Sequence, residues 1–413
     1  MALAALIFAS RTIDDGSDLL RASLPLAGAT LLEHQVRRAV RAGANHIVVL
    51  VERLPAALIG AVDRLRKGGT RVDIARSVAD AADRIHPDET VLVISDGCIA
   101  GADVFNRLVA SPAPAVMALP DLPGLEDFER IGAQHRWAGL VVIEGDRLQA
   151  IAARLGEWDF ELTLLRQALA DDAAILTAFG PSTDTLPHER PVIARDVADL
   201  ATLEQRIIDG SAGFRDGWAA RYIFPLIERI GFARLARGPT DPWWLGVTAI
   251  VLGVIAIPLA AVGWFPLALA LLVASGPLAS IARRLADVRM TRLRHEHRLY
   301  AARLSAASAA LIALGIRLGD DGQWGWALLA VLIVGVMFAL TREWRTAHRL
   351  DNRADMPFMA TGDGVIWMFI PFALAGRWGV GMMVAAVYAV TSFVVAQRLV
   401  HDAIAAKMRG SSG

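Results

Sequence analysis

Six apolar stretches in the second half of the chain decide what this protein can fold into. Each holds roughly 16–22 residues, which is enough or nearly enough to cross a hydrocarbon layer of about 30 Å as a helix. We therefore expect six membrane-spanning helices, at residues 243–264, 266–281, 300–316, 324–340, 365–375 with its flanks, and 380–396.

The distribution of arginine predicts how these spans are oriented. The connections after the second and fourth spans are rich in arginine, whereas those after the first, third and fifth are short and poor in it. Because cytoplasmic connections carry the excess of positive charge, both termini and the whole first half are expected in the cytoplasm. The sequence thus predicts a multi-pass protein of the inner (plasma) membrane.

The first half, residues 1–209, is predicted to be a cytoplasmic, doubly wound α/β domain. Short runs of β-forming residues occur at 2–9, 46–51, 90–94 and 140–143, and a helical stretch at 31–42 separates the first two. Strands that alternate with helices indicate a parallel sheet. The chain has one cysteine, Cys98, which excludes an internal disulfide and a cysteine-rich zinc site. Nothing in it indicates nucleic-acid binding.

Asp96 is the candidate ligand-binding residue of this domain. It follows the apolar run at 91–94, so we expect it at the carboxyl end of a strand, where ligands bind in such sheets. A carboxylate there can hold a divalent ion and, through it, a nucleotide phosphate. The alternative is an ordinary loop aspartate that caps the next helix.

Residues 210–239 are expected to form a juxtamembrane helix. Apolar residues recur there at helical spacing with arginines between them, which is typical of a helix that lies in the lipid headgroup layer. Packing against the soluble domain is the alternative. The six-helix membrane domain then covers residues 240–409, and residues 410–413 are a tail.

The order of these parts resembles a known fusion of two enzyme families. Segments 24–28, 31–34, 42–44 and 47–49 resemble the stretch after the nucleotide loop of sugar- or inositol-phosphate nucleotidyltransferases, and Asp96 matches their metal-binding aspartate. The membrane half resembles CDP-alcohol phosphatidyltransferases, whose Ala-Arg pair is matched by residues 282–283. The resemblance implies a nucleotidyltransferase-like domain followed by a phosphotransferase-like bundle.

Both halves depart from the motifs of these families. The expected phosphate-binding loop, residues 8–16, keeps one glycine and contains two aspartates that would repel phosphate. The membrane family uses four aspartates to hold two metal ions on the CDP diphosphate and to supply a base. Counted from the Ala-Arg pair, the first two aspartate positions fall on Ser275 and Leu278, and the third and fourth fall on Glu296 and Tyr300. The glycine that precedes the third and fourth falls on Arg292.

Two functions therefore stay open from the sequence. The first is a divergent CDP-alcohol phosphotransferase-like enzyme of phospholipid or envelope-lipid synthesis, with Mg²⁺ or Mn²⁺ as cofactor. The second is a catalytically inactive pseudoenzyme that binds lipid or nucleotide, or scaffolds a partner enzyme. In both, membrane lipid is the expected partner and a CDP-linked or other nucleotide-linked donor is the expected ligand. Small residues at 306–310 permit a homodimer through the spans.

For the enzyme, the resemblance assigns a role to each candidate residue. Arg283 would contact phosphate, and Glu296 would hold the metal or act as base. Gly276 would let the diphosphate approach closely, beside Ser275 and Arg292 in the donor site. Asp363 is a further metal candidate, because an ionisable residue at the start of a span is costly unless it is paired. Its pairing with nearby arginines is the structural alternative.

Overall fold

The computed structural model divides the chain into two compact units. Unit 1 is Met1–Ser211 with Val288–Thr291, and unit 2 is Ala212–Asp287 with Arg292–Gly413. The structure describes residues 2–13, 18–154, 159–179, 189–210, 217–238, 240–291, 295–319, 322–350 and 357–410.

Unit 1 is built on a seven-stranded sheet in the order β10-β8-β9-β6-β1-β4-β5. Two small two-stranded sheets, β2-β3 and β7-β11, accompany it. The strands are β1 (Leu3–Phe8), β2 (Pro25–Leu26), β3 (Ala29–Thr30), β4 (His46–Leu50), β5 (Val72–Ala75), β6 (Thr90–Ile94), β7 (Cys98–Ile99), β8 (Ala115–Pro120), β9 (His135–Glu144), β10 (Ala174–Thr177) and β11 (Val192–Ile193).

The large sheet is mixed rather than wholly parallel. β1 pairs in parallel with β4 on one side and with β6 on the other, as expected. β9, however, runs antiparallel to both of its neighbours, β6 and β8. No helix lies between β8 and β9 in the chain, and a parallel neighbour would need a crossover connection, usually helical. The α/β class is confirmed, and the sheet departs from the expected direction at this strand.

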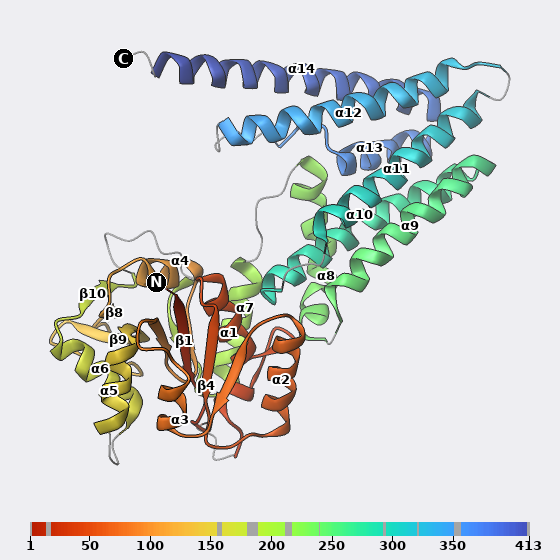
Figure 1. Cartoon of the computed structure of the whole chain (residues 1–413). Coiled ribbons are helices and arrows are strands. Elements are labelled where there is room, and N and C mark those ends of the chain that lie inside the picture. Colours follow the sequence, from red (N-terminus) through yellow and green to blue (C-terminus); the bar gives the residue numbers. More distant parts are fainter. Residues whose placement is uncertain are drawn as a thin grey trace. The chain divides into compact units, whose positions relative to one another are not determined.

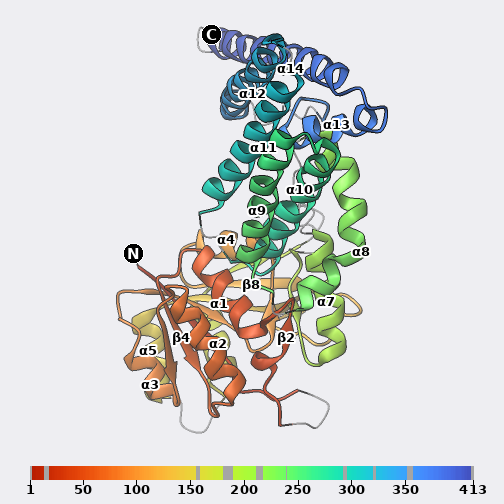
Figure 2. The same cartoon turned by 90° about the vertical axis from the view of Figure 1, so that its right-hand side faces the viewer.

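Helices cover both faces of this sheet (Figure 1 and Figure 2). Side chains of α1, α2 and α4 form one apolar core with alternate residues of β1, namely Leu3, Ala5 and Ile7. Side chains of α3, α5 and α6 form a second core with Leu6 and Phe8. The helices of unit 1 are α1 (Leu31–Arg41), α2 (Ala56–Lys67), α3 (Val78–Asp83), α4 (Ala102–Val109), α5 (Gly145–Arg154), α6 (Phe160–Ala170) and α7 (Val197–Gly210).

Unit 2 is helical. A π-helical turn, η3 (Ala219–Ile223), leads into the first of its helices. These are α8 (Phe224–Arg237), α9 (Pro242–Val262), α10 (Phe265–Val288), α11 (Glu296–Leu318), α12 (Gly325–Leu350), α13 (Gly362–Leu374) and α14 (Trp378–Gly410).

Five described helices of unit 2 are long and apolar enough to cross a membrane. They lie within α9, α10, α11, α12 and α14, and they match five of the six predicted spans. The segment expected as the fifth span is instead the 13-residue helix α13. At 1.5 Å per residue this helix is about 20 Å long, so it is too short to cross the hydrocarbon layer alone. The six-span prediction is therefore only approximately met.

The juxtamembrane helix α8 belongs to unit 2. Its Glu228 is fully buried and accepts hydrogen bonds from Ser280 and Arg284 of α10, both at 2.8 Å. Its opposite face carries Ile230, which is 88% exposed. One face of α8 thus packs on α10 while the other presents apolar side chains. The position of α8 in the lipid headgroup layer stays a prediction.

Candidate functional site

The first candidate site lies at the carboxyl ends of β1 and β6. These strands are neighbours in the sheet, yet the chain winds from β1 towards β4 and β5 on one side and reaches β6 on the other. In open α/β sheets ligands bind where the winding reverses, outside the carboxyl ends of the strands. Asp96 follows β6 at this place, and Arg11 follows β1.

Asp96 is enclosed at this edge, with only 2% of its surface exposed. Its Oδ2 accepts a hydrogen bond from the backbone N–H of Arg11 at 2.6 Å. Its Oδ1 is buried and has no hydrogen-bond partner among the described residues. Burial above all, together with the nearby Glu161 carboxylate, raises the pKa of Asp96 to about 7. A buried acceptor without a partner marks a place that a ligand could fill.

Glu161 is the residue of this cluster that the sequence analysis missed. It lies in the first turn of α6 and is 4% exposed. The Ser95 hydroxyl donates a hydrogen bond to its Oε1, and a guanidinium nitrogen of Arg11 lies 3.3 Å from its Oε2. Burial raises its pKa. The sequence signal around it, an acidic residue two positions after the helix-capping Asp159, also occurs at exposed helix starts and does not reveal burial.

The chain that follows Asp96 approaches a segment from the end of unit 1 closely. Gly97 has φ +79°, and a Cβ there would lie 2.7 Å from the carbonyl oxygen of Ala194. Just beyond, β7 pairs antiparallel with β11. Glycine is therefore required for the close approach of the two segments. In this arrangement the Arg11 side chain is directed at carboxylates, namely Glu161 and, at 3.6 Å, Asp159.

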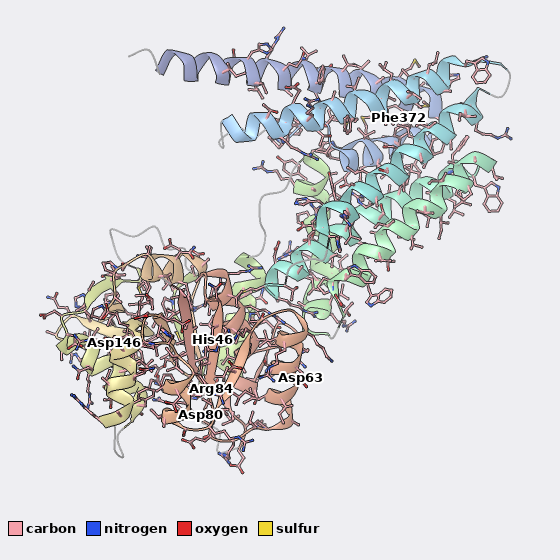
Figure 3. All side chains as sticks on the ribbon, viewed as in Figure 1. His46, Asp63, Asp80, Arg84, Asp146 and Phe372 are labelled. Carbon is pink, nitrogen blue, oxygen red and sulfur yellow. The ribbon has the colours of Figure 1, made fainter. Side chains whose placement is uncertain are left out.

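Elsewhere in unit 1, several titratable side chains form ion pairs. Asp80 and Arg84 lie one turn apart on α3 at 2.7 Å, with more than a third of each side chain exposed (Figure 3). His46 of β4 lies 2.8 Å from Asp73 of the neighbouring strand β5. The Asp80–Arg84 pair is largely exposed, whereas His46 is buried.

The second candidate site lies inside unit 2, around a buried ion pair. The Nη1 and Nη2 atoms of Arg303 in α11 lie 2.7 and 2.8 Å from the two carboxylate oxygens of Asp363 in α13. Arg303 Nη1 also lies 3.3 Å from Oγ of Ser275 in α10. Gly276 permits this packing, because a Cβ there would lie 2.8 Å from Asp363 Oδ1. Three helices therefore meet at one guanidinium.

Tyr300 lies between this pair and Arg283. The guanidinium carbon of Arg283 is 5.5 Å from the centre of the Tyr300 ring, and that of Arg303 is 5.9 Å from it. Both distances are within the range of a cation–π contact. Tyr300 occupies the position of the fourth aspartate in the resemblance, so an aromatic ring stands where that family has a carboxylate.

The structure brings some of the predicted site residues together and leaves others apart. Ser275, Gly276 and Asp363 meet, and the partner that joins them is Arg303, which the sequence analysis did not single out. Glu296 lies in the exposed first turn of α11. Arg292 lies outside the described residues.

The residues around Asp363 do not fit a divalent cation. Both oxygens of Asp363 accept hydrogen bonds from Arg303, and the neighbouring predicted positions supply a serine hydroxyl and a glycine. Within the described ranges there is no group of three or more His, Cys, Asp or Glu side chains placed to hold a metal. The metal roles of Glu296, Asp96 and Asp363, and the Mg²⁺ or Mn²⁺ cofactor, stay predictions.

One curated enzyme decides the family of the N-terminal half. The 2-C-methyl-D-erythritol 4-phosphate cytidylyltransferase of Saccharopolyspora erythraea is 30% identical to this chain over 221 residues. The match covers 48% of this chain and 94% of that enzyme. Through its N-terminal half, this chain belongs to the 2-C-methyl-D-erythritol 4-phosphate cytidylyltransferase family. No family model matches the chain.

The match lies in the N-terminal half of the chain, which contains most of unit 1. The predicted resemblance to nucleotidyltransferases is confirmed at this coarser level. The resemblance of the membrane unit to CDP-alcohol phosphatidyltransferases stays a prediction.

Proposed function

We propose that this chain is a membrane-embedded protein that binds cytidine nucleotide and lipid without carrying out group transfer. The Arg303–Asp363 pair is the observation that carries the proposal. A CDP-alcohol phosphotransferase would need several carboxylates at this place to hold two metal ions on the diphosphate. Here a guanidinium occupies the one buried carboxylate among the predicted ligands of the membrane unit.

The proposal places cytidine nucleotide at the β1–β6 edge of unit 1. Support comes from the cytidylyltransferase relative and from the buried, unpartnered Oδ1 of Asp96. A nucleotide phosphate would reach this oxygen through a divalent ion, since the carboxylate and phosphate charges repel each other directly. Transfer is not part of the proposal, because the Arg11 side chain is paired with Glu161 instead of being free for a triphosphate.

Binding and turnover measured on the same full-length protein test the proposal. CTP and CDP binding would be measured in detergent with and without Mg²⁺, followed by product analysis with a CDP-alcohol and candidate acceptors. We expect Mg²⁺-dependent binding that Asp96→Asn abolishes and that Asp80→Asn, at an exposed carboxylate, leaves intact. Formation of a transfer product by wild type, or failure of wild type to bind any cytidine nucleotide, would contradict the proposal.

An active, divergent phosphotransferase is the second candidate. It is favoured by the contact of Arg283 with Tyr300, which brings the arginine of the family-like pair to the buried cluster. In this case the exposed Glu296 would supply the metal ligand or base. Turnover that requires Mg²⁺ or Mn²⁺ and disappears in Glu296→Ala would establish this candidate over the first.

A further inference from the structure

Unit 2 contains a cavity of about 790 Å³ whose lining shares Tyr300, but not Arg303, Asp363 or Ser275, with the second candidate site. α10, α11, α12 and α13 form most of its wall. This volume lies within the range of cavities that hold one small or medium-sized organic molecule. The residues that line the cavity indicate which kind of ligand it can bind.

Most of the wall is apolar. Leu272 of α10, Leu311 of α11, Ile333 of α12 and Phe369 of α13 line it, and alanines of α11 make room between them. A ligand that fills this space must therefore carry a long apolar part, because a polar group there would lose its hydration without finding a partner.

One end of the cavity is polar and basic. His297 and Tyr300 come from the first turns of α11, Arg342 and Arg345 from the last third of α12, and Thr361 from the start of α13. α11 and α12 contact each other and are joined by a short connection, so the start of one helix lies beside the end of the other. These side chains therefore gather at a single end.

The charge at this end suits an anion. Arg342 and Arg345 are exposed and three residues apart, so they share one side of α12. Within the described ranges neither forms an ion pair with a carboxylate. Thr361 caps α13 and accepts a hydrogen bond from the N–H of Gly364, so the positive end of the α13 dipole also points to this place.

We propose that this cavity binds one anionic phospholipid molecule. Its phosphate lies at Arg342 and Arg345, where guanidinium groups match the geometry of phosphate oxygens. Its acyl chains lie among α10, α11, α12 and α13. The inference rests on the lipid binding in the proposed function and names the class of lipid and the place where it is held.

Native mass spectrometry of the full chain tests this inference. Wild type would be released from nanodiscs of phosphatidylcholine that contain a minority of phosphatidylglycerol. We expect one phosphatidylglycerol retained per chain. In Arg342→Gln/Arg345→Gln retention should fall by about tenfold or more, which corresponds to about 1.4 kcal/mol. The matched control is Arg377→Gln, which removes an exposed arginine that does not line the cavity.

A second variant separates the cavity from simple attraction of headgroups to surface arginines. Ala307→Phe fills the cavity and keeps every arginine, whereas Ala261→Phe adds the same ring to an exposed position of α9 outside it. Ser305→Phe, also in the lining, serves if Ala307→Phe does not fold. Loss of the lipid in the filled variants but not in Ala261→Phe supports the inference.

Several results would overturn the inference. These are retention of phosphatidylglycerol in the filled variants or in the double arginine variant, equal retention of phosphatidylcholine, and displacement of the lipid by inorganic phosphate alone. The lipid measurement involves neither nucleotide nor turnover. A negative lipid result therefore does not contradict nucleotide binding, and a negative nucleotide result does not contradict lipid binding in the cavity.

Discussion

At the scale of single residues, Arg303 is the largest side chain among the described residues that are less than 2% exposed. A charge so deep in an apolar unit is tolerated only when it is paired and hydrogen-bonded. Its two contacts with Asp363 satisfy that condition. Each member of the pair therefore depends on the other more strongly than surface ion pairs do.

We predict that Arg303→Met alone or Asp363→Asn alone destabilises the full chain by about 3–5 kcal/mol, because each leaves a buried polar or charged group without its partner. The double variant Arg303→Met/Asp363→Leu should recover most of this loss. Unfolding in detergent by denaturant titration measures the change. Arg84→Ala breaks an exposed pair and should have no measurable effect. Additive losses in the double variant would contradict the prediction.

The raised pKa of Asp96 predicts a pH dependence. Its ordinary value is 3.8 and its value in the fold is about 7. The folded state thus binds this proton more tightly than the unfolded state, and the resulting stability is present below about pH 4 and is lost as the pH rises to about 7. The difference corresponds to at most about 4 kcal/mol.

Thermal unfolding of the full chain between pH 5 and 8 checks this dependence. We expect the stability of unit 1 to decline with rising pH in wild type and to be flatter in Asp96→Asn, which keeps an oxygen for the Arg11 N–H. Glu161, whose pKa is also raised, adds to the wild-type slope and stays in the variant. Identical pH profiles for wild type and variant would show that Asp96 is already ionised in the fold.

At the scale of elements, α8 has one buried face and one exposed apolar face. Phe224, Glu228 and Phe232 recur every four residues on its inner face, and all three are buried. The guanidinium of Arg284 lies 4.2 Å from the Phe232 ring while it binds Glu228. Leu226 and Ile230 on other sides are 62% and 88% exposed. The contact with α10 thus combines aromatic packing with one buried carboxylate.

We predict that Glu228→Ala loosens α8 from α10. Arg284 has 15% of its side chain exposed and would lose a partner at 2.8 Å, so the amides of α8 should exchange with solvent deuterium at least about tenfold faster, the equivalent of about 1.4 kcal/mol. Hydrogen exchange measured in detergent reports this. Ile230→Ala on the exposed side should leave the exchange of α8 unchanged. Equal protection in Glu228→Ala would mean that apolar contacts alone hold the helix.

At the scale of the whole molecule, local patterns predicted the elements well. The expected strand at 90–94 is β6, and the expected helix at 31–42 is α1, whose start is fixed by a capping box between Thr30 and Glu33. Such signals lie within a few residues, so the sequence alone reveals them. The length of the apolar runs likewise identified five helices that are long and apolar enough to cross a membrane.

The candidate sites depend on contacts between distant residues, which no local pattern encodes. Ser95 and Glu161 are 66 positions apart, and Arg303 and Asp363 are 60 apart. A charged residue in a helix looks the same in the sequence whether it faces water or a buried partner. For this reason Glu161 and Arg303 were missed. The reversed direction of β9 is also a property of the whole sheet.

Because α13 is short, the helices of unit 2 allow two membrane topologies. If α13 and its flanks cross the membrane, Arg377 lies outside the cytoplasm and His401 inside. If α13 turns back, the two positions exchange sides. The arginine distribution favours the first arrangement. We predict that an introduced Arg377→Cys reacts with an impermeant maleimide on intact cells and that His401→Cys does not. The opposite pattern would establish five crossings.

That labelling experiment is simplified by the environment of Cys98. The only thiol of the chain is fully buried beside the central sheet, where its Sγ donates to the carbonyl oxygen of Ala138 at 3.3 Å. Burial raises the pKa of the thiol far above its ordinary value, so almost none of the nucleophilic thiolate forms. Cys98 therefore need not be replaced before labelling experiments. A cysteine introduced on the surface would react selectively with probes, spin labels or crosslinkers.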